Sequence, residues 1–200
     1  MLASSGVSGR LRGMNRVVFV LLLSSLSTCV AHADGPPTQD TNKSEAAQER
    51  RTRFAGSWRW VGGEKEVAAR DAAVEKGIES LFFAIRGIAR SKIKSSVEIR
   101  QQIGFAFQNG SMTLSASGRS DVTSPEDGRV IAYKGEDGKT VKLAQAFVGE
   151  RTLVQTFNAD EGGRSTSFAL SADGKTLRAT YKIFSPKLSN PIVYTLTYQR

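Results

Sequence analysis

From Val97 to Arg200, apolar and polar residues alternate with a period of two, which is the pattern of half-buried β-strands. Short connections that contain Asn-Gly, Asp-Gly or Gly-Gly, the pairs that tight hairpin turns prefer, separate the alternating runs. About eight strands are predicted in this way, at 97–107, 111–117, 129–133, 140–148, 152–158, 164–170, 176–184 and 192–199. Hairpin-connected strands in series form an up-and-down meander, and a meander of this length closes into a barrel.

Two further elements are predicted ahead of this meander. Residues 54–61 are predicted to form a strand, and residues 64–91 are predicted to be helical. Apolar residues of the helical segment fall on one face, but Gly77 interrupts it, so the pattern allows one helix or a helix-turn-helix pair. The predicted fold is therefore mainly β: an antiparallel up-and-down β-barrel of about eight to ten strands, with a helix or helix pair between strands 1 and 2.

Residues 1–33 are typical of an export signal. Arginines give the segment a basic start, residues 17–26 form an apolar run too short to span a bilayer, and Ala31-His32-Ala33 has the form of a cleavage site. Residues 34–53 are polar and lack an apolar period, so we expect a weakly ordered linker there, followed by one barrel domain at 54–200. The expected protein is exported and is periplasmic or associated with the envelope.

Cys29 leaves a second way of processing open. Leu26-Ser27-Thr28-Cys29 resembles a bacterial lipobox, in which the cysteine is lipidated and becomes the first residue of the mature chain. Thr28 departs from the Gly, Ala or Ser that this motif favours before the cysteine. The sequence therefore allows either removal of the thiol with the signal or a lipid anchor at Cys29.

Cleavage after Ala33 would remove the chain's one histidine and its one cysteine. Without them, a Ser-His-Asp triad, a Cys-His dyad and a zinc site built on His or Cys are excluded. Neighbouring acids fall in predicted turns, where they serve turn geometry and solubility, and no EF-hand spacing occurs. We therefore expect a protein that is not an enzyme and that holds no metal or cofactor.

The chain carries 28 Lys and Arg against 19 Asp and Glu, a formal net charge of +9. Such a surplus suits an anionic envelope surface or an acidic ligand, and it is equally an ordinary solubility feature. The basic residues are scattered and form no basic run, so nucleic acid is not expected as a partner. A monomer is expected.

The first predicted strand carries Gly56-x-Trp58, and the last one ends next to Arg200. With the up-and-down strands between them, these residues resemble the calycin superfamily, the lipocalins and fatty-acid-binding proteins. The resemblance implies that Gly56, Trp58 and Arg200 close the barrel, with the arginine against the tryptophan, and that the helices form a lid, as in the fatty-acid-binding branch. That branch is cytosolic, and its carboxylate-holding Arg-x-Tyr appears here reversed, as Tyr198-x-Arg200, so no carboxylate site is assigned to these residues.

Four polar side chains share the predicted inward phase of apolar strand neighbours: Gln101, Gln145, Gln155 and Tyr181. A buried amide without a partner costs about 1–3 kcal/mol, so the glutamines need a ligand, ordered water or one another as partners. We predict these four residues to bind ligand. Mutual hydrogen bonding of the glutamines through water and a core role for the tyrosine are the alternatives.

Phe83 lies opposite the apolar face of the helical segment, among Arg86 and Arg90. An aromatic side chain among cations on a lid is suited to contact an anionic membrane while a ligand passes. Packing of Phe83 against the linker is the alternative.

These features predict an exported, non-enzymatic protein that holds a small hydrophobic or amphipathic, lipid-like ligand in a β-barrel, with polar side chains fixing its head group. The alternative is an envelope structural or interaction protein whose barrel is filled by its own side chains, because barrels of this size are either packed or hollow.

Overall fold

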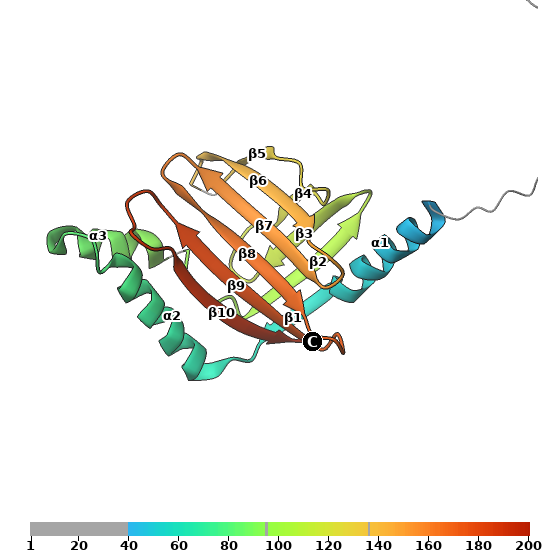
Figure 1. Cartoon of the computed structure of the whole chain (residues 1–200), viewed down its shortest axis with the longest axis horizontal. Coiled ribbons are helices and arrows are strands. Elements are labelled where there is room, and N and C mark those ends of the chain that lie inside the picture. Colours follow the sequence, from blue (N-terminus) through green and yellow to red (C-terminus); the bar gives the residue numbers. More distant parts are fainter. Residues whose placement is uncertain (1–39, 95, 136) are drawn as a thin grey trace, which may run out of the picture. The chain divides into compact units, whose positions relative to one another are not determined.

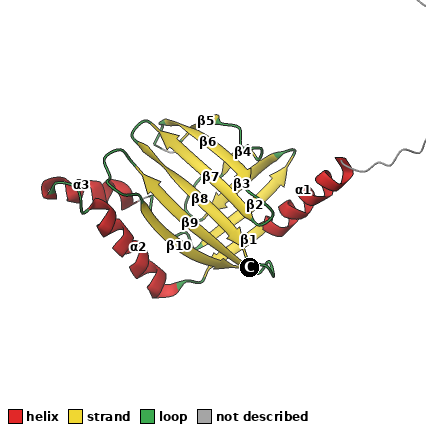
Figure 2. Ribbon diagram, viewed as in Figure 1, coloured by secondary structure: helices red, strands yellow, loops and turns green. Residues whose placement is uncertain are grey.

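The computed structural model describes residues 40–94, 96–135 and 137–200. One helix precedes the first strand, and a helix pair separates the first strand from the second (Figure 1; Figure 2). The helices are α1 (Asp40–Phe54), α2 (Gly63–Ile78) and α3 (Phe83–Lys94). The strands are β1 (Gly56–Trp60), β2 (Gln102–Gln108), β3 (Ser111–Ala116), β4 (Val122–Pro125), β5 (Ile131–Lys134), β6 (Thr140–Phe147), β7 (Thr152–Ala159), β8 (Gly162–Leu170), β9 (Thr176–Phe184) and β10 (Ile192–Gln199). The predicted export signal, with Cys29, lies outside the described residues.

The strands form one antiparallel sheet with the order β4-β3-β2-β1-β10-β9-β8-β7-β6-β5. Consecutive strands pair with each other except β4 and β5, which are the two edges of the sheet, and β1 joins β10 through Arg59–Gln199 and Trp60–Tyr198. The sheet coils into a nearly closed barrel (Figure 1), because β4 also approaches β6. The predicted fold class, an up-and-down barrel with helices between strands 1 and 2, is confirmed.

Strand limits were predictable where alternation is regular. β9 and β10 coincide with the predicted runs. β4 was not predicted, because it is only four residues long and ends in a proline. β2 begins at Gln102 and not at Val97, because the chain bends at Gln101 before pairing starts.

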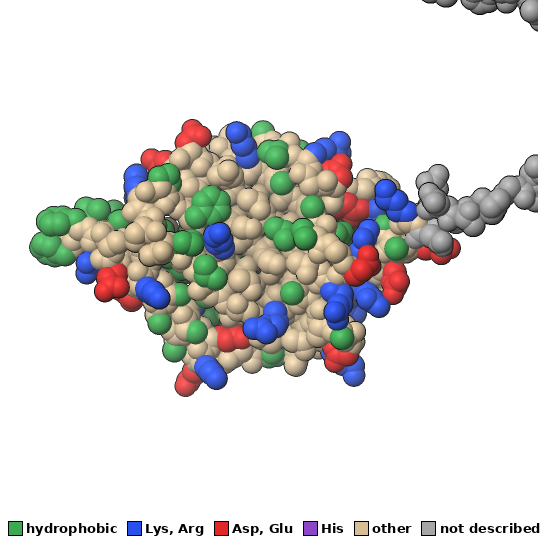
Figure 3. Space-filling view, in the orientation of Figure 1, with side chains coloured by type: hydrophobic (Ala, Val, Ile, Leu, Met, Phe, Trp, Pro, Cys, Tyr) green, Lys and Arg blue, Asp and Glu red, His purple; other side chains and the backbone are tan. Residues whose placement is uncertain are grey.

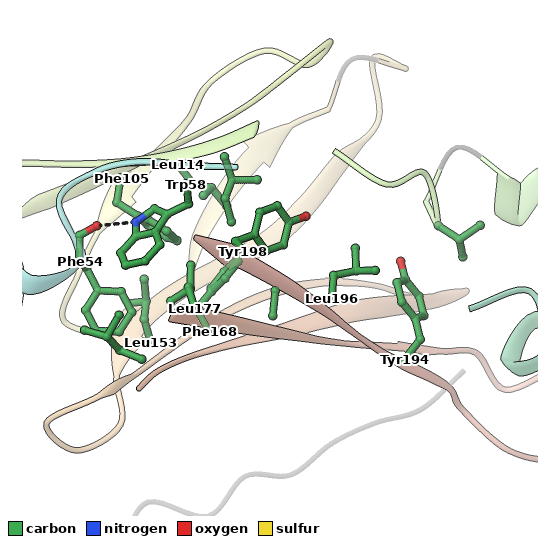
Figure 4. Packing of buried hydrophobic residues seen from close by; sticks show 14 of the residues in the cluster. Phe54, Trp58, Phe105, Leu114, Leu153, Phe168, Leu177, Tyr194, Leu196 and Tyr198 are labelled. Carbon is green, nitrogen blue, oxygen red and sulfur yellow. Dashed lines mark hydrogen bonds between the residues drawn. The ribbon is translucent and has the colours of Figure 1, made fainter. Parts of the chain in front are cut away.

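The barrel core is one cluster of buried apolar side chains drawn from strands that are far apart in the sequence. Phe105 contacts Phe54 and Phe168 edge to face, with ring centroids 5.9 Å and 5.1 Å apart. Trp58 is fully buried beside them, and its Nε1 donates a hydrogen bond to the Phe54 carbonyl oxygen at 3.0 Å (Figure 4). The apolar faces predicted from alternation therefore meet at the barrel centre.

Residues 40–53 correct one expectation, since they belong to helix α1 and are not a weakly ordered linker. Arg51 of α1 forms an ion pair with Glu126, and Arg50 pairs with Glu150 at 3.3 Å. Phe54, the last residue of the helix, is fully buried in the core. The helix lacks an apolar stripe of its own, so contacts with distant parts of the chain stabilise it.

Helix α2 is attached to the barrel along β10. The carboxylate of Glu66 accepts hydrogen bonds from Trp60 Nε1 at 2.9 Å, from Thr197 N at 2.9 Å and from Thr197 Oγ1 at 2.6 Å. At Gly77 the helix comes so close to Ile192 that an added Cβ would lie 2.3 Å from its Cγ1 atom. A charged hydrogen-bond acceptor and a tight packing contact thus hold α2 in place.

The predicted helical segment is a helix pair, interrupted at residues 79–82. Arg86 of α3 donates hydrogen bonds to the backbone oxygens of Leu81, at 2.9 Å, and Glu79. These bonds satisfy carbonyl groups that the helix end leaves without an intrahelical partner. Gly77 lies within α2, so its role is close packing and not the helix break.

Replacing Gly77 with alanine should lower the free energy of unfolding by about 1 kcal/mol or more, because Ile192 has to move, even after the gain in helix propensity. Gly87→Ala in α3 is the matched control, since nothing lies within 4 Å of its added Cβ. That change should raise stability by about 0.5–1 kcal/mol. Equilibrium urea unfolding followed by tryptophan fluorescence compares the two variants, and equal effects would contradict the close packing.

Candidate ligand-binding site

A cavity of about 360 Å³ lies inside the barrel, at the end formed by the β3–β4 turn, the β5–β6 turn and the connection from α3 to β2. The apolar part of its wall includes Ile103, Leu114, Phe157 and Phe168. Strand alternation places Gln155, Arg164, Thr166 and Tyr181 among them. The loops at this end add charged side chains of both signs: Glu98, Arg100, Arg119 and Asp137. This mixture of apolar wall and few polar groups is typical of small-molecule sites.

Arg164 reaches the cavity from the start of β8, where it shares the inward face with Thr166 and Phe168. Its guanidinium lies over the Phe157 ring at 5.0 Å, and its Nε atom is buried without a hydrogen-bond partner among the described residues. Burial lowers the pKa of Arg164, but an arginine remains protonated at physiological pH. The cavity wall therefore carries a positive charge that no described carboxylate pairs with.

Two more arginines line the same cavity. Arg100 forms an ion pair with Glu98 at 2.9 Å and donates a hydrogen bond to the Ser117 carbonyl oxygen at 3.2 Å. Arg119 lines the cavity from the β3–β4 turn. The charges of both also disfavour the protonated form of Arg164, so they add to the positive potential at its guanidinium.

Three tyrosines on β9 and β10 complete the polar part of the interior. Tyr181, which lines the cavity, stacks on Tyr194 with ring centroids 5.0 Å apart. The hydroxyl of Tyr194 is buried and has no hydrogen-bond partner within the described ranges, and the hydroxyl of Tyr198 is buried next to Tyr181. Burial raises the pKa of all three tyrosines, so at neutral pH their hydroxyls are protonated and able to donate.

Gln145 and Gln155 lie inside the barrel and are hydrogen-bonded to each other. Gln155 Nε2 donates to Gln145 Oε1 at 2.7 Å, and Gln145 Nε2 donates to Ser124 Oγ at 2.6 Å and to the Met112 carbonyl oxygen at 3.2 Å. The chain of bonds joins β7, β6, β4 and β3. Gln155 lines the cavity, whereas Gln145 joins β6 to β3 and β4.

The structure places Gln101 differently from the expectation that three glutamines line the lumen. Gln101 is exposed in the bend before β2, and its carbonyl oxygen accepts a hydrogen bond from Trp60 N at 2.9 Å. The inward phase of β2 starts only at Ile103, because the strand begins at Gln102. The prediction extended the alternation of β2 back across the bend, where residues do not alternate between the two faces of a strand.

Gly56, Trp58 and Arg200 lie at one end of the barrel. The Arg200 guanidinium stands over the Trp58 ring at 4.6 Å and donates hydrogen bonds to the carbonyl oxygens of Arg53 and Ala55. Gly56 has a φ of 109°, a conformation that other residues rarely adopt, at the point where α1 gives way to β1. These contacts belong to the packing of the barrel and not to the cavity.

Helix α3 presents apolar side chains to solvent. Phe83 is 74% exposed and contacts Phe82, which is 69% exposed, edge to face at 5.2 Å. With Ile85 and Ile88 these rings form an apolar tip, seen at the left of Figure 3. The described lining residues of the cavity include none from α2 or α3, although Ser96 and Glu98 line it directly after α3, and the lid expected of the helices stays a prediction.

The two arginines predicted beside Phe83 are both engaged with the protein. Arg86 binds backbone oxygens at the end of α2, and Arg90 forms an ion pair with Glu75 at 2.6 Å. Lys92 and Lys94, in the last turn of α3, are exposed. Near the apolar tip, the two arginines are therefore engaged in contacts within the protein, whereas the two lysines are exposed.

Sequence reasoning missed Arg164, although a signal for it existed. Arg164 is in phase with Phe168 in the predicted strand 164–170, the same relation that identified Gln145 and Gln155. A charged residue at the first position of a run is easily assigned to the preceding turn. Here the strand begins earlier, at Gly162, so Arg164 lies within it.

The described residues carry neither a membrane-spanning helix nor a metal-binding cluster. None of their helices is long and apolar enough to cross a membrane. No group of three or more His, Cys, Asp or Glu residues among them is arranged to hold a metal ion.

No protein-family model and no curated protein sequence matches the chain. Solved structures do resemble it. A Schistosoma mansoni fatty acid binding protein in complex with arachidonic acid is 16% identical, with a TM-score of 0.47, over 76% of this chain and 98% of that one. Lipid binding protein 8 of Caenorhabditis elegans is 11% identical, with a TM-score of 0.47, over 74% and 96%. The strand order itself, with a helix pair after the first strand, is the calycin-like architecture that the sequence resembles.

Proposed function

We propose that this protein is an exported, non-enzymatic carrier of a small amphipathic molecule with an anionic head group. The barrel interior holds the ligand, and Arg164 binds its head group. The observation that carries the proposal is the guanidinium of Arg164, which lies on the cavity wall with a buried Nε and without a described carboxylate partner.

The unpaired charge argues for an anion. An ionised side chain removed from water is costly unless it is paired and hydrogen-bonded. A carboxylate or phosphate in the cavity would supply both, because the guanidinium fork donates two parallel bonds to such groups. Tyr181 and Gln155 line the same space and are placed to donate further hydrogen bonds to the head group.

The remainder of the wall argues for an apolar tail. Ile103, Leu114, Phe157 and Phe168 present hydrocarbon to the cavity, where it would contact water in the absence of a ligand. The volume of about 360 Å³ lies at the lower end of the range for small-molecule pockets. A short or bent chain suits this space better than a bulky lipid.

Native mass spectrometry of the protein, recovered gently from the periplasm, tests the proposal. We expect a stoichiometric additional mass that organic extraction removes, and the extract should contain an anionic amphiphile. The stripped protein should bind a dansyl-labelled fatty acid. A clean apo mass, with no binding of the dansyl probe, would instead favour a barrel filled by its own side chains, acting as an envelope interaction protein.

We further propose an anionic membrane surface as the place where the ligand is exchanged. Helix α3 contains no acidic residue, four basic ones, and the exposed apolar tip of Phe82, Phe83, Ile85 and Ile88. A helix with apolar and basic surfaces of this kind suits the interface of an anionic bilayer, since each Phe contributes about 1.5–3 kcal/mol when fully buried.

Replacing Phe82 and Phe83 together with serine should weaken binding to phosphatidylglycerol-containing vesicles by about tenfold or more, because both rings lose their burial in lipid. The control is Val130→Ser with Val148→Ser, which removes two exposed apolar side chains elsewhere on the barrel. Vesicle co-sedimentation measures the difference. Equal binding of the two double variants would exclude α3 as the contact.

A further inference from the structure

A row of polar side chains crosses the barrel interior at one level, on the adjacent strands β6 to β10 (Figure 1). In the register of the sheet, each residue of the row is paired directly with the next: Gln145, Gln155, Thr166, Tyr181 and Tyr194. The neighbouring inward row on one side is wholly apolar, and the one on the other side is apolar except for Arg164. Because a barrel interior is otherwise apolar, a complete polar row in register indicates a specific role.

The row is removed from water. Gln145, Gln155 and Thr166 are at most 1% exposed, and Tyr194 is 5% exposed. Gln145 uses its amide group within the protein, through its bonds to Gln155, Ser124 and Met112. The Tyr194 hydroxyl, in contrast, is buried without a hydrogen-bond partner within the described ranges. Buried polar groups without partners are costly, so the free groups of the row require a partner from outside the chain.

The free groups of the row include an acceptor as well as donors. Gln155 donates an amide hydrogen to Gln145, and among the described residues no side chain donates to its own Oε1 atom. An ionised carboxylate only accepts hydrogen bonds. The head group proposed for Arg164 can therefore use the donors of the row, but it cannot satisfy Gln155 Oε1. A ligand that satisfies both kinds of group must also carry a donor.

These polar groups lie on one side of the cavity. Gln155, Thr166 and Tyr181, the middle of the row, line it, whereas β2 and β3 contribute only apolar side chains among its described lining residues. The two sides face each other across the interior, because Phe105 of β2 packs against Phe168 of β8 with ring centroids 5.1 Å apart. A ligand held there would meet polar groups along one side of its chain and hydrocarbon along the other.

We propose that the row is a second recognition site, which binds a hydroxyl group carried on the apolar chain of the ligand. The ligand is then a hydroxylated anionic amphiphile, such as a hydroxy fatty acid. Arg164 binds the head group, and Thr166 lies two residues further along β8, about 7 Å away. A hydroxyl both donates and accepts, so it can donate to Gln155 Oε1 and accept from Thr166 Oγ1. This inference rests on the ligand-binding function proposed above.

The row should reverse the effect that a hydroxyl group has on affinity. In an apolar cavity a hydroxyl weakens binding, because it loses its hydrogen bonds to water. In a site that bonds to it, the analogue without the hydroxyl binds less well, because buried polar groups stay unpaired.

Displacement of a dansyl-labelled fatty acid compares dodecanoate, 6-hydroxydodecanoate and 12-hydroxydodecanoate. We expect 6-hydroxydodecanoate to bind about tenfold more tightly than dodecanoate. The 12-hydroxy acid, whose hydroxyl lies at the far end of the chain, should gain nothing.

Thr166→Val links this preference to the row, because valine keeps the branched shape and removes the hydroxyl. The affinity ratio of 6-hydroxydodecanoate to dodecanoate should fall to about one in this variant. Thr180→Val is the matched control. Thr180 faces outward on β9, where its Oγ1 lies 3.0 Å from Thr195 Oγ1, so the preference should be retained in full.

The wild-type comparison stands even if a variant fails to fold. Equal or weaker binding of 6-hydroxydodecanoate by the wild type would overturn the second site and leave the carrier function in place. A preference that Thr166→Val retains would overturn it as well. If neither dodecanoate nor the dansyl-labelled probe binds, the proposed carrier function fails, and the second site fails with it.

Discussion

Trp58→Ala should lower the free energy of unfolding by about 3–5 kcal/mol, the range for removal of a large buried aromatic side chain. Trp58 has no exposed surface, and its indole Nε1 is bonded to the Phe54 carbonyl oxygen. The Arg200 guanidinium stands over the ring at 4.6 Å. Truncation would leave a cavity at the barrel end and remove a cation–π contact at the same time.

Equilibrium urea unfolding followed by far-UV circular dichroism gives the loss of stability, because the fluorescence signal changes with the tryptophan itself. Trp58→Phe is the matched control, since it keeps a ring in place but loses the hydrogen bond. It should cost less than the alanine variant. A loss below about 1 kcal/mol for Trp58→Ala would contradict a barrel-closing role for the residue.

Arg164→Leu is expected to weaken ligand binding without lowering the stability of the protein. Affinity for an anionic dansyl-labelled fatty acid should fall by about 100-fold, because loss of one partner of a buried charge pair costs about 2–5 kcal/mol. The unliganded variant should be as stable as the wild type or more so, since replacing an unpaired buried charge with an apolar group removes a desolvation penalty.

Two controls make this result specific. Arg178→Leu removes a charge from the outer face of the neighbouring strand, where the side chain is exposed, and should leave the affinity unchanged. The uncharged alcohol corresponding to the dansyl probe should bind wild type and Arg164→Leu alike. Equal losses for both probes, or a large loss of stability without ligand, would show that Arg164 is a packing residue and not an anion site.

Most of the barrel could be predicted from the chain because strand alternation is a local pattern. β9 and β10 were placed to the residue, since each alternates for eight or nine residues between turn sequences. β4 was missed because four residues ending in proline carry almost no periodic signal. The closure of the barrel, where β4 approaches β6, could not be predicted for the same reason.

The candidate site was only partly predictable. Gln145 and Gln155 were placed inside by their phase, but the phase did not show that Gln145 would bind Ser124 of β4 and Met112 of β3. Gln101 was misplaced because a bend interrupts the phase just before β2. Arg164 becomes a binding candidate only when it is known that no described carboxylate pairs with it.

The sequence by itself determined the elements whose pattern is local: the strands, the helical segment, and the glycine and aromatic residues at its turns and first strand. Tertiary structure alone decided which distant groups meet. Helix α1 has no apolar stripe and is held by Glu126 and Glu150, far along the chain. Helix α2 is positioned along β10 by Glu66 and Gly77. Such contacts join residues remote in sequence, and no local periodicity encodes them.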